Sequence, residues 1–192
     1  MKKLLITGFD PFGGESVNPS WEAVRLLPKA VGNYELCKLQ IPTVFGLAGE
    51  TILKKAEEIH PDVIICVGQA GGRAAVTPER IGINIRDARI ADNRGIIPCD
   101  EPVVPGGPDA CFSTLPIKAM IAAITDAGLP GAVSNTAGTF VCNDVLYTLL
   151  HHYRGTQVRC GFIHVPYLPQ QGTPNLPIED TAKALEAAIR VL

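Results

Sequence analysis

The sequence lacks any long apolar stretch, and this absence excludes one class of protein at the outset. None of its apolar runs approaches the roughly 18 residues that a membrane-crossing helix needs. The first residues, MKKLLITGFDPFGG, place only a short apolar run after two lysines, which is too little for the core of a signal peptide. We therefore expect a cytoplasmic protein without a membrane partner.

Charge is also sparse. Asp, Glu, Lys and Arg make up 19% of the 192 residues, the formal net charge is −2, and the 17 lysines and arginines form no basic run. Proteins that bind nucleic acid carry a basic patch or stripe, so a nucleic-acid partner is not expected. So few charges leave much apolar surface, and we expect further copies of the chain to cover part of it in a homo-oligomer.

Patterns typical of metal sites are missing as well. The chain has six cysteines, but no two of them have the C-x-x-C spacing of zinc or thioredoxin-like sites. There is no H-E-x-x-H motif, and the adjacent His151 and His152 would point to different faces of a helix. Most cysteines lie in apolar strand-like runs, so we expect reduced thiols and neither a metal nor a cofactor.

Apolar runs alternate with helical patterns along the chain. We predict strands at residues 3–7, 34–41, 62–68, 131–136 and 159–166, an exposed strand or hairpin at 80–90, and helices at 18–27, 46–60, 113–128, 139–155 and 178–192. This alternation predicts the α/β class, with a mostly parallel sheet between two helical layers in a single domain, 1–192. Residues 92–112, rich in proline and glycine, predict a long loop that serves as a lid or an interface.

Cys142 lies where a short strand and a glycine turn lead into a helix. With Thr139 as N-cap, Cys142 is the third helical residue, among free backbone N–H groups at the positive end of the helix dipole. This position is expected to lower the pKa of a thiol and to favour a nucleophile. The alternative is a small buried core residue, the usual fate of a free cysteine, and both interpretations stay open on these grounds.

A thiol nucleophile needs a base, and His164 is the best-placed histidine. It ends the apolar strand CGFIHV, so it should emerge at the same sheet edge as the turn before Cys142. Glu79, after the glycine-rich loop GQAGGR, is a candidate to orient the imidazole; its alternative is a surface ion pair with Arg73 or Arg80.

The glycine-rich loops allow a different class of function. GFDPFGG and GQAGGR follow strands and could hold a nucleotide or another anion in a non-catalytic α/β module. Neither loop matches G-x-G-x-x-G or the lysine-bearing P-loop, which counts against this hypothesis. Two interpretations of Phe9 and Phe12 in the first loop stay open: they pack in the core, or they form the wall of a small apolar pocket.

Two longer stretches indicate a family. GGRAAVTPERIGIN and VSNTAGTFVCN, together with TGFDPFGGESVNPSWEA, DARIADNRG and GFIHVPYLP, resemble the pyroglutamyl peptidase I (pyrrolidone-carboxylate peptidase) family of cysteine peptidases. The resemblance runs through most of the chain. It departs from the family pattern at Ala91, where proline is frequent, and at Asp144, where histidine or other residues occur.

The resemblance implies a three-layer α/β/α sandwich with a twisted, mostly parallel sheet, and a homo-oligomer that is often a tetramer. It implies that Cys142 is the nucleophile, His164 the base and Glu79 the orienting acid, and that Arg89 polarises the scissile carbonyl. The lactam pocket that it implies consists of Phe9, Phe12, Asn18, Gln69, Phe140 and Val141. The implied reaction is hydrolysis of the amide bond after an N-terminal pyroglutamyl residue, which releases 5-oxoproline without a cofactor. A relative that keeps the fold but has lost the activity is a third possibility, which the intact set of Cys142, His164 and Glu79 argues against.

Overall fold

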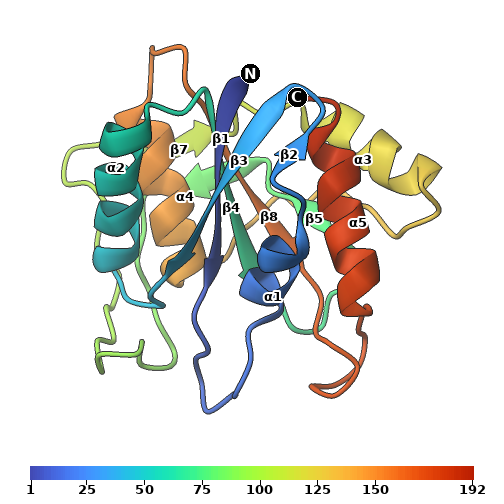
Figure 1. Ribbon diagram of the computed structural model, residues 1–192. Coiled ribbons are helices and arrows are strands. Elements are labelled where there is room, and N and C mark those ends of the chain that lie inside the picture. The colour runs from blue at the N-terminus through green and yellow to red at the C-terminus, as the bar shows by residue number, and fades with distance from the viewer.

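The computed structural model describes all residues, Met1–Leu192, and contains one main sheet between two layers of helices (Figure 1). The strands of this sheet are β1 (Lys2–Phe9), β2 (Ala30–Val31), β3 (Tyr34–Ile41), β4 (Val63–Gln69), β5 (Thr77–Pro78) and β8 (Arg159–Val165). Their order is β2-β3-β1-β4-β8-β5; β3, β1, β4 and β8 are parallel, and the short edge strands β2 and β5 are antiparallel to their neighbours. The mostly parallel α/β sandwich predicted from the sequence is confirmed.

The helices divide between the two faces of the sheet. They are α1 (Pro19–Leu26), α2 (Leu47–Ile59), α3 (Ile117–Asp126), α4 (Val141–His152) and α5 (Ile178–Ile189). Figure 1 shows α2 and α4 on one face and α1, α3 and α5 on the other. Each layer closes its own core, because strands that are covered on both faces must bury apolar side chains on both.

The parallel strands bring three connecting loops to one edge of the sheet. Phe9, Gln69 and Val165 end β1, β4 and β8, and all three strands point toward the lower edge of the sheet in Figure 1. Asn18 caps α1 as predicted, since its side chain accepts a hydrogen bond from Ser20 N, and Pro19 is the first helical residue. The loops that contain the candidate residues therefore lie together.

Three local predictions were wrong. Residues 131–136 form no strand, but only isolated bridges from Gly131 to Val76 and from Ser134 to Glu79. The parallel ladder cannot continue between these bridges because Pro78 has no N–H to donate.

The second error concerns residues 80–112. The expected exposed strand is only β6 (Ile81–Ile83), and it pairs with β7 (Ala110–Phe112), which ends the segment predicted as loop. The third concerns the start of α4. Phe140 is its N-cap, because the hydroxyl of Thr139 donates instead to Asp87 O at 2.7 Å.

Candidate active site

Cys142 is the second residue of α4 and lies over a strand residue without a side chain. A Cβ atom built on Gly68 would lie 2.9 Å from Cys142 Sγ and 2.6 Å from Cζ of Phe162. Real Cβ contacts are longer than this, so the sulfur occupies space that only glycine leaves open. The thiol is thus held directly above the end of β4.

His164 lies beside this position on the next strand. It is the register partner of Gly68 in the parallel pair of β4 and β8. Cys66 and Phe162, two residues earlier in each strand, belong to the core beneath α4, so Gly68 and His164 face the same helix. The rings of Phe162 and His164 lie 4.7 Å apart. The fold therefore places the imidazole and the thiol on one face of the sheet, at neighbouring positions.

Glu79 orients the imidazole from the strand on the other side of β8. Its Oε1 accepts a hydrogen bond from His164 Nδ1 at 2.7 Å, and its backbone N–H donates to Phe162 O at 2.9 Å. The side chains of Glu79 and His164 are 0% and 4% exposed. The pair is thus buried and aligned, with Nε2 of the imidazole left free for chemistry.

Arg73 completes this cluster. Its Nη1 donates to Glu79 Oε1 at 2.6 Å and to Thr77 Oγ1 at 2.7 Å, and its Nη2 donates to Thr136 O at 2.9 Å. One carboxylate oxygen of Glu79 thus contacts the imidazole and the guanidinium together, but Glu79 is fully buried, so the ion pair is not the surface pair of the sequence-based alternative. The sequence indicates Arg73 only as an alternative partner of Glu79. Its place in the loop after β4 was the signal that it reaches the same edge.

Burial favours a neutral imidazole and a neutral thiol in this cluster. Burial lowers the pKa of His164, although Glu79 opposes the shift. Burial opposes ionisation of Glu79, but its contacts with His164, Ser134 and Arg73 hold its pKa below the usual range. Burial, and then the charge of Glu79, raise the pKa of the Cys142 thiol to about 12.

This finding differs from the expectation that the helix N-terminus lowers the pKa of the thiol. The charge of Arg73 and the backbone N–H of Cys142 lower the pKa of the thiol, but the loss of water around the sulfur outweighs them.

Arg89 lies two residues after Asp87, whose backbone is hydrogen-bonded to Thr139 in the turn before α4. Its side chain is exposed and has no hydrogen bond or ion pair within the chain. It lines a hollow of about 580 Å³ together with residues of its own loop and of the turn before α4. The other residues that line this hollow are Asp87, Ala88, Ile90, Gly138, Thr139 and Phe140. A free guanidinium beside the turn before Cys142 is available to an incoming carbonyl oxygen.

The predicted pocket residues separate into two groups. The rings of Phe12 and Phe140 lie 6.0 Å apart, and Phe45, which sequence analysis missed, packs edge-on against Phe140 at 5.2 Å. These three rings form an aromatic group at the start of α4. Gln69, at the end of β4, accepts a hydrogen bond on its Oε1 from Gln171 at 3.1 Å. Its amide N–H₂ forms no hydrogen bond within the chain.

The remaining predicted pocket residues are buried within the fold. Phe9 is 2% exposed, and its ring lies 6.2 Å from that of Phe162. Val141 is fully buried in the first turn of α4. Asn18 is 2% exposed, and both ends of its amide are occupied, by Ser20 on one side and by Asp10 O on the other. These three side chains are thus enclosed by the fold.

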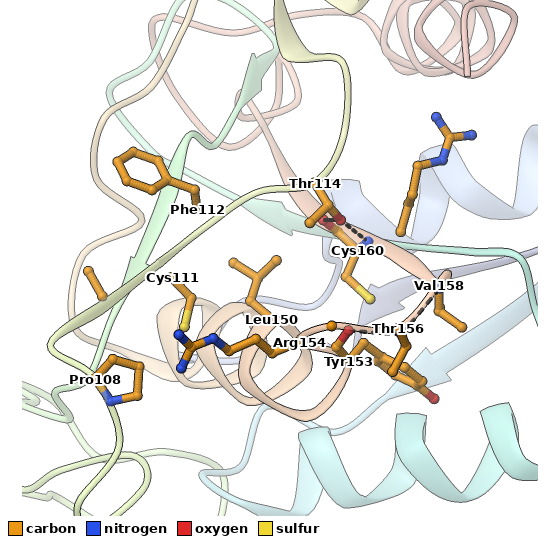
Figure 2. A pocket seen from close by; sticks show the side chains of 13 residues that line it. Pro108, Cys111, Phe112, Thr114, Leu150, Tyr153, Arg154, Thr156, Val158 and Cys160 are labelled. Atoms are coloured by element: carbon orange, nitrogen blue, oxygen red, sulfur yellow. Dashed lines mark hydrogen bonds between the residues drawn. The ribbon is translucent and has the colours of Figure 1, made fainter.

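A separate hollow of about 290 Å³ lies at the other end of α4 (Figure 2). Figure 2 shows Cys111, Tyr153 and Arg154 around it, and none of the residues that surround Cys142. It is therefore distinct from the candidate site. No group of three or more His, Cys, Asp or Glu side chains is arranged to hold a metal ion. None of the helices has the length and apolar character needed to cross a membrane.

The sequence and the fold both match known proteins. A family model described as pyroglutamyl peptidase matches residues 2–192. The pyrrolidone-carboxylate peptidase of Erwinia tasmaniensis is 52% identical over 197 residues, covering 100% of this chain and 92% of the relative. That of Clostridium perfringens is 53% identical over 197 residues, covering 99% and 92%.

Solved structures agree with these matches. The crystal structure of Bacillus amyloliquefaciens pyroglutamyl peptidase I gives a TM-score of 0.96 at 48% identity, covering 99% of this chain and 96% of that one. The pyrrolidone carboxyl peptidase from Thermococcus litoralis gives 0.95 at 38% identity, covering 100% and 93%. The similarity in sequence and in fold thus extends over nearly the whole chain.

Proposed function

The chain belongs to the pyroglutamyl peptidase family and is a pyroglutamyl peptidase, and we propose that Cys142, His164 and Glu79 carry out its reaction. The observation that carries this assignment is the position of Cys142 Sγ above Gly68, the register partner of His164, whose Nδ1 is held by Glu79 at 2.7 Å. The comparisons favour this peptidase over the alternative of an anion-binding module.

The first half of the reaction forms an acyl-enzyme. Cys142 Sγ attacks the carbonyl carbon after the pyroglutamyl ring, while Nε2 of His164 takes the thiol proton. The carbonyl oxygen becomes an oxyanion, and free backbone N–H groups at the start of α4 and the guanidinium of Arg89 stabilise it. When the intermediate collapses, the C–N bond breaks and the imidazolium returns the proton to the leaving amine, which leaves a thioester on Cys142.

The second half releases the acid. His164 takes a proton from a water molecule as its oxygen attacks the thioester carbonyl, and 5-oxoproline leaves as the thiol is reformed. Glu79 keeps the proton of the imidazole on Nδ1 throughout and stabilises the imidazolium. Arg73 forms an ion pair with the same carboxylate oxygen of Glu79 and so favours the ionised form of that carboxylate. No metal or cofactor is required in any step.

Recognition of the lactam ring is assigned to the aromatic group and to Gln69. Phe12, Phe45 and Phe140 present apolar faces to the ring, and the free amide N–H₂ of Gln69 donates to the lactam C=O. Proline lacks that carbonyl, so a prolyl substrate leaves the amide N–H₂ of Gln69 without this partner. Phe9, Asn18 and Val141 act indirectly by holding these walls.

Assembly and location are further parts of the proposal. We propose a homo-oligomer, a tetramer, in the cytoplasm, with N-terminal pyroglutamyl peptides as substrates. Exposed apolar side chains support the assembly: Ile90, Ile96, Ile97 and Phe112 are 51%, 44%, 58% and 68% exposed. An apolar surface of this kind is typical of a face that another subunit covers.

The test of the function is release of a chromophore from pyroglutamyl, prolyl and glutamyl amides, with reductant and chelator present. The wild-type protein is expected to be selective for the pyroglutamyl amide, and Cys142→Ala is expected to have no turnover while keeping the wild-type unfolding transition. Equal hydrolysis of the prolyl amide would contradict the proposed lactam recognition, and turnover by Cys142→Ala would contradict the nucleophile.

A further inference from the structure

Asp144 is a buried carboxylate that the proposed reaction does not use. It lies in the first turn of α4, two residues after Cys142, and its side chain is 1% exposed. Its Oδ1 accepts a hydrogen bond from Arg86 Nε at 2.6 Å, and its Oδ2 accepts one from Gly46 N at 2.8 Å. A carboxylate this deeply buried is held by partners that satisfy both of its oxygens. Asp144 therefore joins three separate segments of the chain at the start of α4.

Arg86 begins a hydrogen-bonded segment of main chain that ends just before Arg89. The backbone of Arg86 forms two hydrogen bonds with Glu101, at 2.7 and 3.0 Å, and the next residue, Asp87, donates to Thr139 O at 3.0 Å. Ala88 N then donates to Pro98 O at 2.9 Å. Arg89 follows this tied segment and has no partner of its own, so the course of the main chain decides where its guanidinium can reach.

Asn143 holds the start of the same segment. Its Nδ2 donates to Ile83 O and Ile85 O, both at 2.9 Å, and its Oδ1 accepts from Ile83 N at 3.0 Å. Asn143 and Asp144, the two residues that follow Cys142, are thus hydrogen-bonded to the main chain at 83–85 and to the side chain of Arg86, respectively. The nucleophile and the segment before Arg89 are therefore fixed to one another through the first turn of α4.

The second bond of Asp144 reaches the aromatic group. Gly46 N is its donor, and the preceding Phe45 packs on Phe140 with ring centroids 5.2 Å apart. The backbone of Phe45 is itself held by Asp92 Oδ2 at 3.0 Å. This arm does not depend on the negative charge of Asp144, because a neutral amide oxygen accepts the same N–H.

We propose that Asp144 is a positioning residue which, through its ion pair with Arg86, holds Arg89 at the carbonyl oxygen of the substrate. The proposal rests on the role assigned to Arg89 in the proposed function. Both carboxylate oxygens of Asp144 are occupied, by Arg86 and by Gly46 N, so it acts through these partners and not on the substrate. Its effect is confined to the transition state, in which the oxygen gains negative charge.

The test is a double-mutant cycle between Asp144 and Arg89. Asp144→Asn keeps the volume and the acceptor for Gly46 N but removes the charge that holds Arg86. We expect it to lower kcat about 10-fold and to change KM by less than about twofold, because only transition-state stabilisation is lost. Arg89→Ala alone should lower kcat about 100-fold, as loss of one oxyanion donor does. The double variant should lie within about twofold of Arg89→Ala, because the first change acts through the second residue.

Independent readouts separate positioning from a general structural effect. The alkylation rate of Cys142 by iodoacetamide should stay within about twofold in Asp144→Asn, because the reagent needs no help from Arg89. Tyr147→Phe is the matched control, since it removes a buried hydrogen bond from the same helix, to Pro108 O, and should leave kcat unchanged. Arg86→Gln removes the same ion pair from the other side and should reproduce the loss in kcat, so the test does not depend on a single variant.

Three outcomes would overturn the proposal. Multiplied losses in the double variant, about 1000-fold in all, would show that Asp144 acts independently of Arg89. A rise in KM with unchanged kcat would place its effect on substrate binding. Unchanged kcat in Arg89→Ala would remove the residue through which Asp144 is said to act, while turnover that still depends on Cys142 would leave the rest of the proposed function intact.

Discussion

Gly68→Ala should separate activity from folding at the position where the thiol lies over the sheet. The new Cβ would lie 2.9 Å from Cys142 Sγ and 2.6 Å from Cζ of Phe162. Ordinary contacts between such atoms are about 3.5–4.0 Å, so the sulfur must move by at least about 0.6 Å. Phe162 must move as well, and its ring is 4.7 Å from that of His164, so both reacting groups are displaced.

The expected loss follows from the displacement. A misplacement of about 1 Å at a reacting centre can cost about 100-fold, so kcat/KM for a pyroglutamyl amide should fall about 10- to 100-fold. The extra methyl group should lower the free energy of unfolding by only about 1–3 kcal/mol, the usual range for overpacking a core. The variant should thus be folded at room temperature and nearly inactive.

Gly161→Ala is the matched control on β8. Its Cβ would lie 2.7 Å from Ser113 Oγ and 2.7 Å from Leu115 Cγ, and Leu115 belongs to the core on the opposite face of the sheet. This variant should lose a similar amount of stability and keep its kcat/KM. Urea unfolding and chromophore release measure the two quantities for each variant. Wild-type kcat/KM in Gly68→Ala would refute the placement of the thiol over this glycine.

Two further predictions concern the charge of the imidazole and the capping of α1. The acid limb of the kcat/KM profile should have its midpoint below pH 6.5, because burial lowers the pKa of His164 and activity is lost as the pH falls through that value. Glu79 raises the same pKa, so Glu79→Gln should move the midpoint to still lower pH, and a shift to higher pH would count against the pairing. Asn18→Ala should lower the free energy of unfolding by about 1–2 kcal/mol in urea, because Ser20 N loses its cap; an unchanged midpoint would show that the cap contributes nothing.

The sheet was predictable because its central strands are buried on both faces. Tyr34–Ile41 has the bounds that the sequence predicts, β4 is shifted by one residue at each end, and β8 ends one residue earlier than predicted. Continuous apolar runs with β-branched residues are typical of such strands. The segment 131–136, GAVSNT, is shorter and less apolar, so its strand formation depended on a partner, and Pro78 interrupts that partner. Propensity along one segment contains no information about the donors of another.

The candidate site was predictable in its residues and not in its electrostatics. Strand order brings the ends of β4 and β8 together, so position indicated Cys142 and His164, whereas the assignment of Glu79 depended on the family resemblance. The position of Cys142 at a helix N-terminus indicated a lowered thiol pKa, whereas its burial raises it. Burial depends on which side chains close over the sulfur, and these come from elements far apart in the sequence.

Contacts between distant segments explain the residues that were missed. Phe45 joins the aromatic group because the loop after β3 lies beside the start of α4, and no pattern around Phe45 marks it. Arg73 and Glu79 are six residues apart, but the importance of their contact depends on His164, which lies 85 residues after Glu79. Such three-way contacts arise only when the sheet has formed.

The central claim is that Cys142 carries the pyroglutamyl group as a thioester during turnover, and mass spectrometry can observe this directly. The protein is mixed with a pyroglutamyl ester or amide, quenched in acid within milliseconds, and its intact mass and peptide map are recorded. We predict one added pyroglutamyl group, located on the peptide that contains Cys142 and absent when a prolyl substrate is used. Turnover without any acylated form, or an acyl group on another residue, would contradict the account.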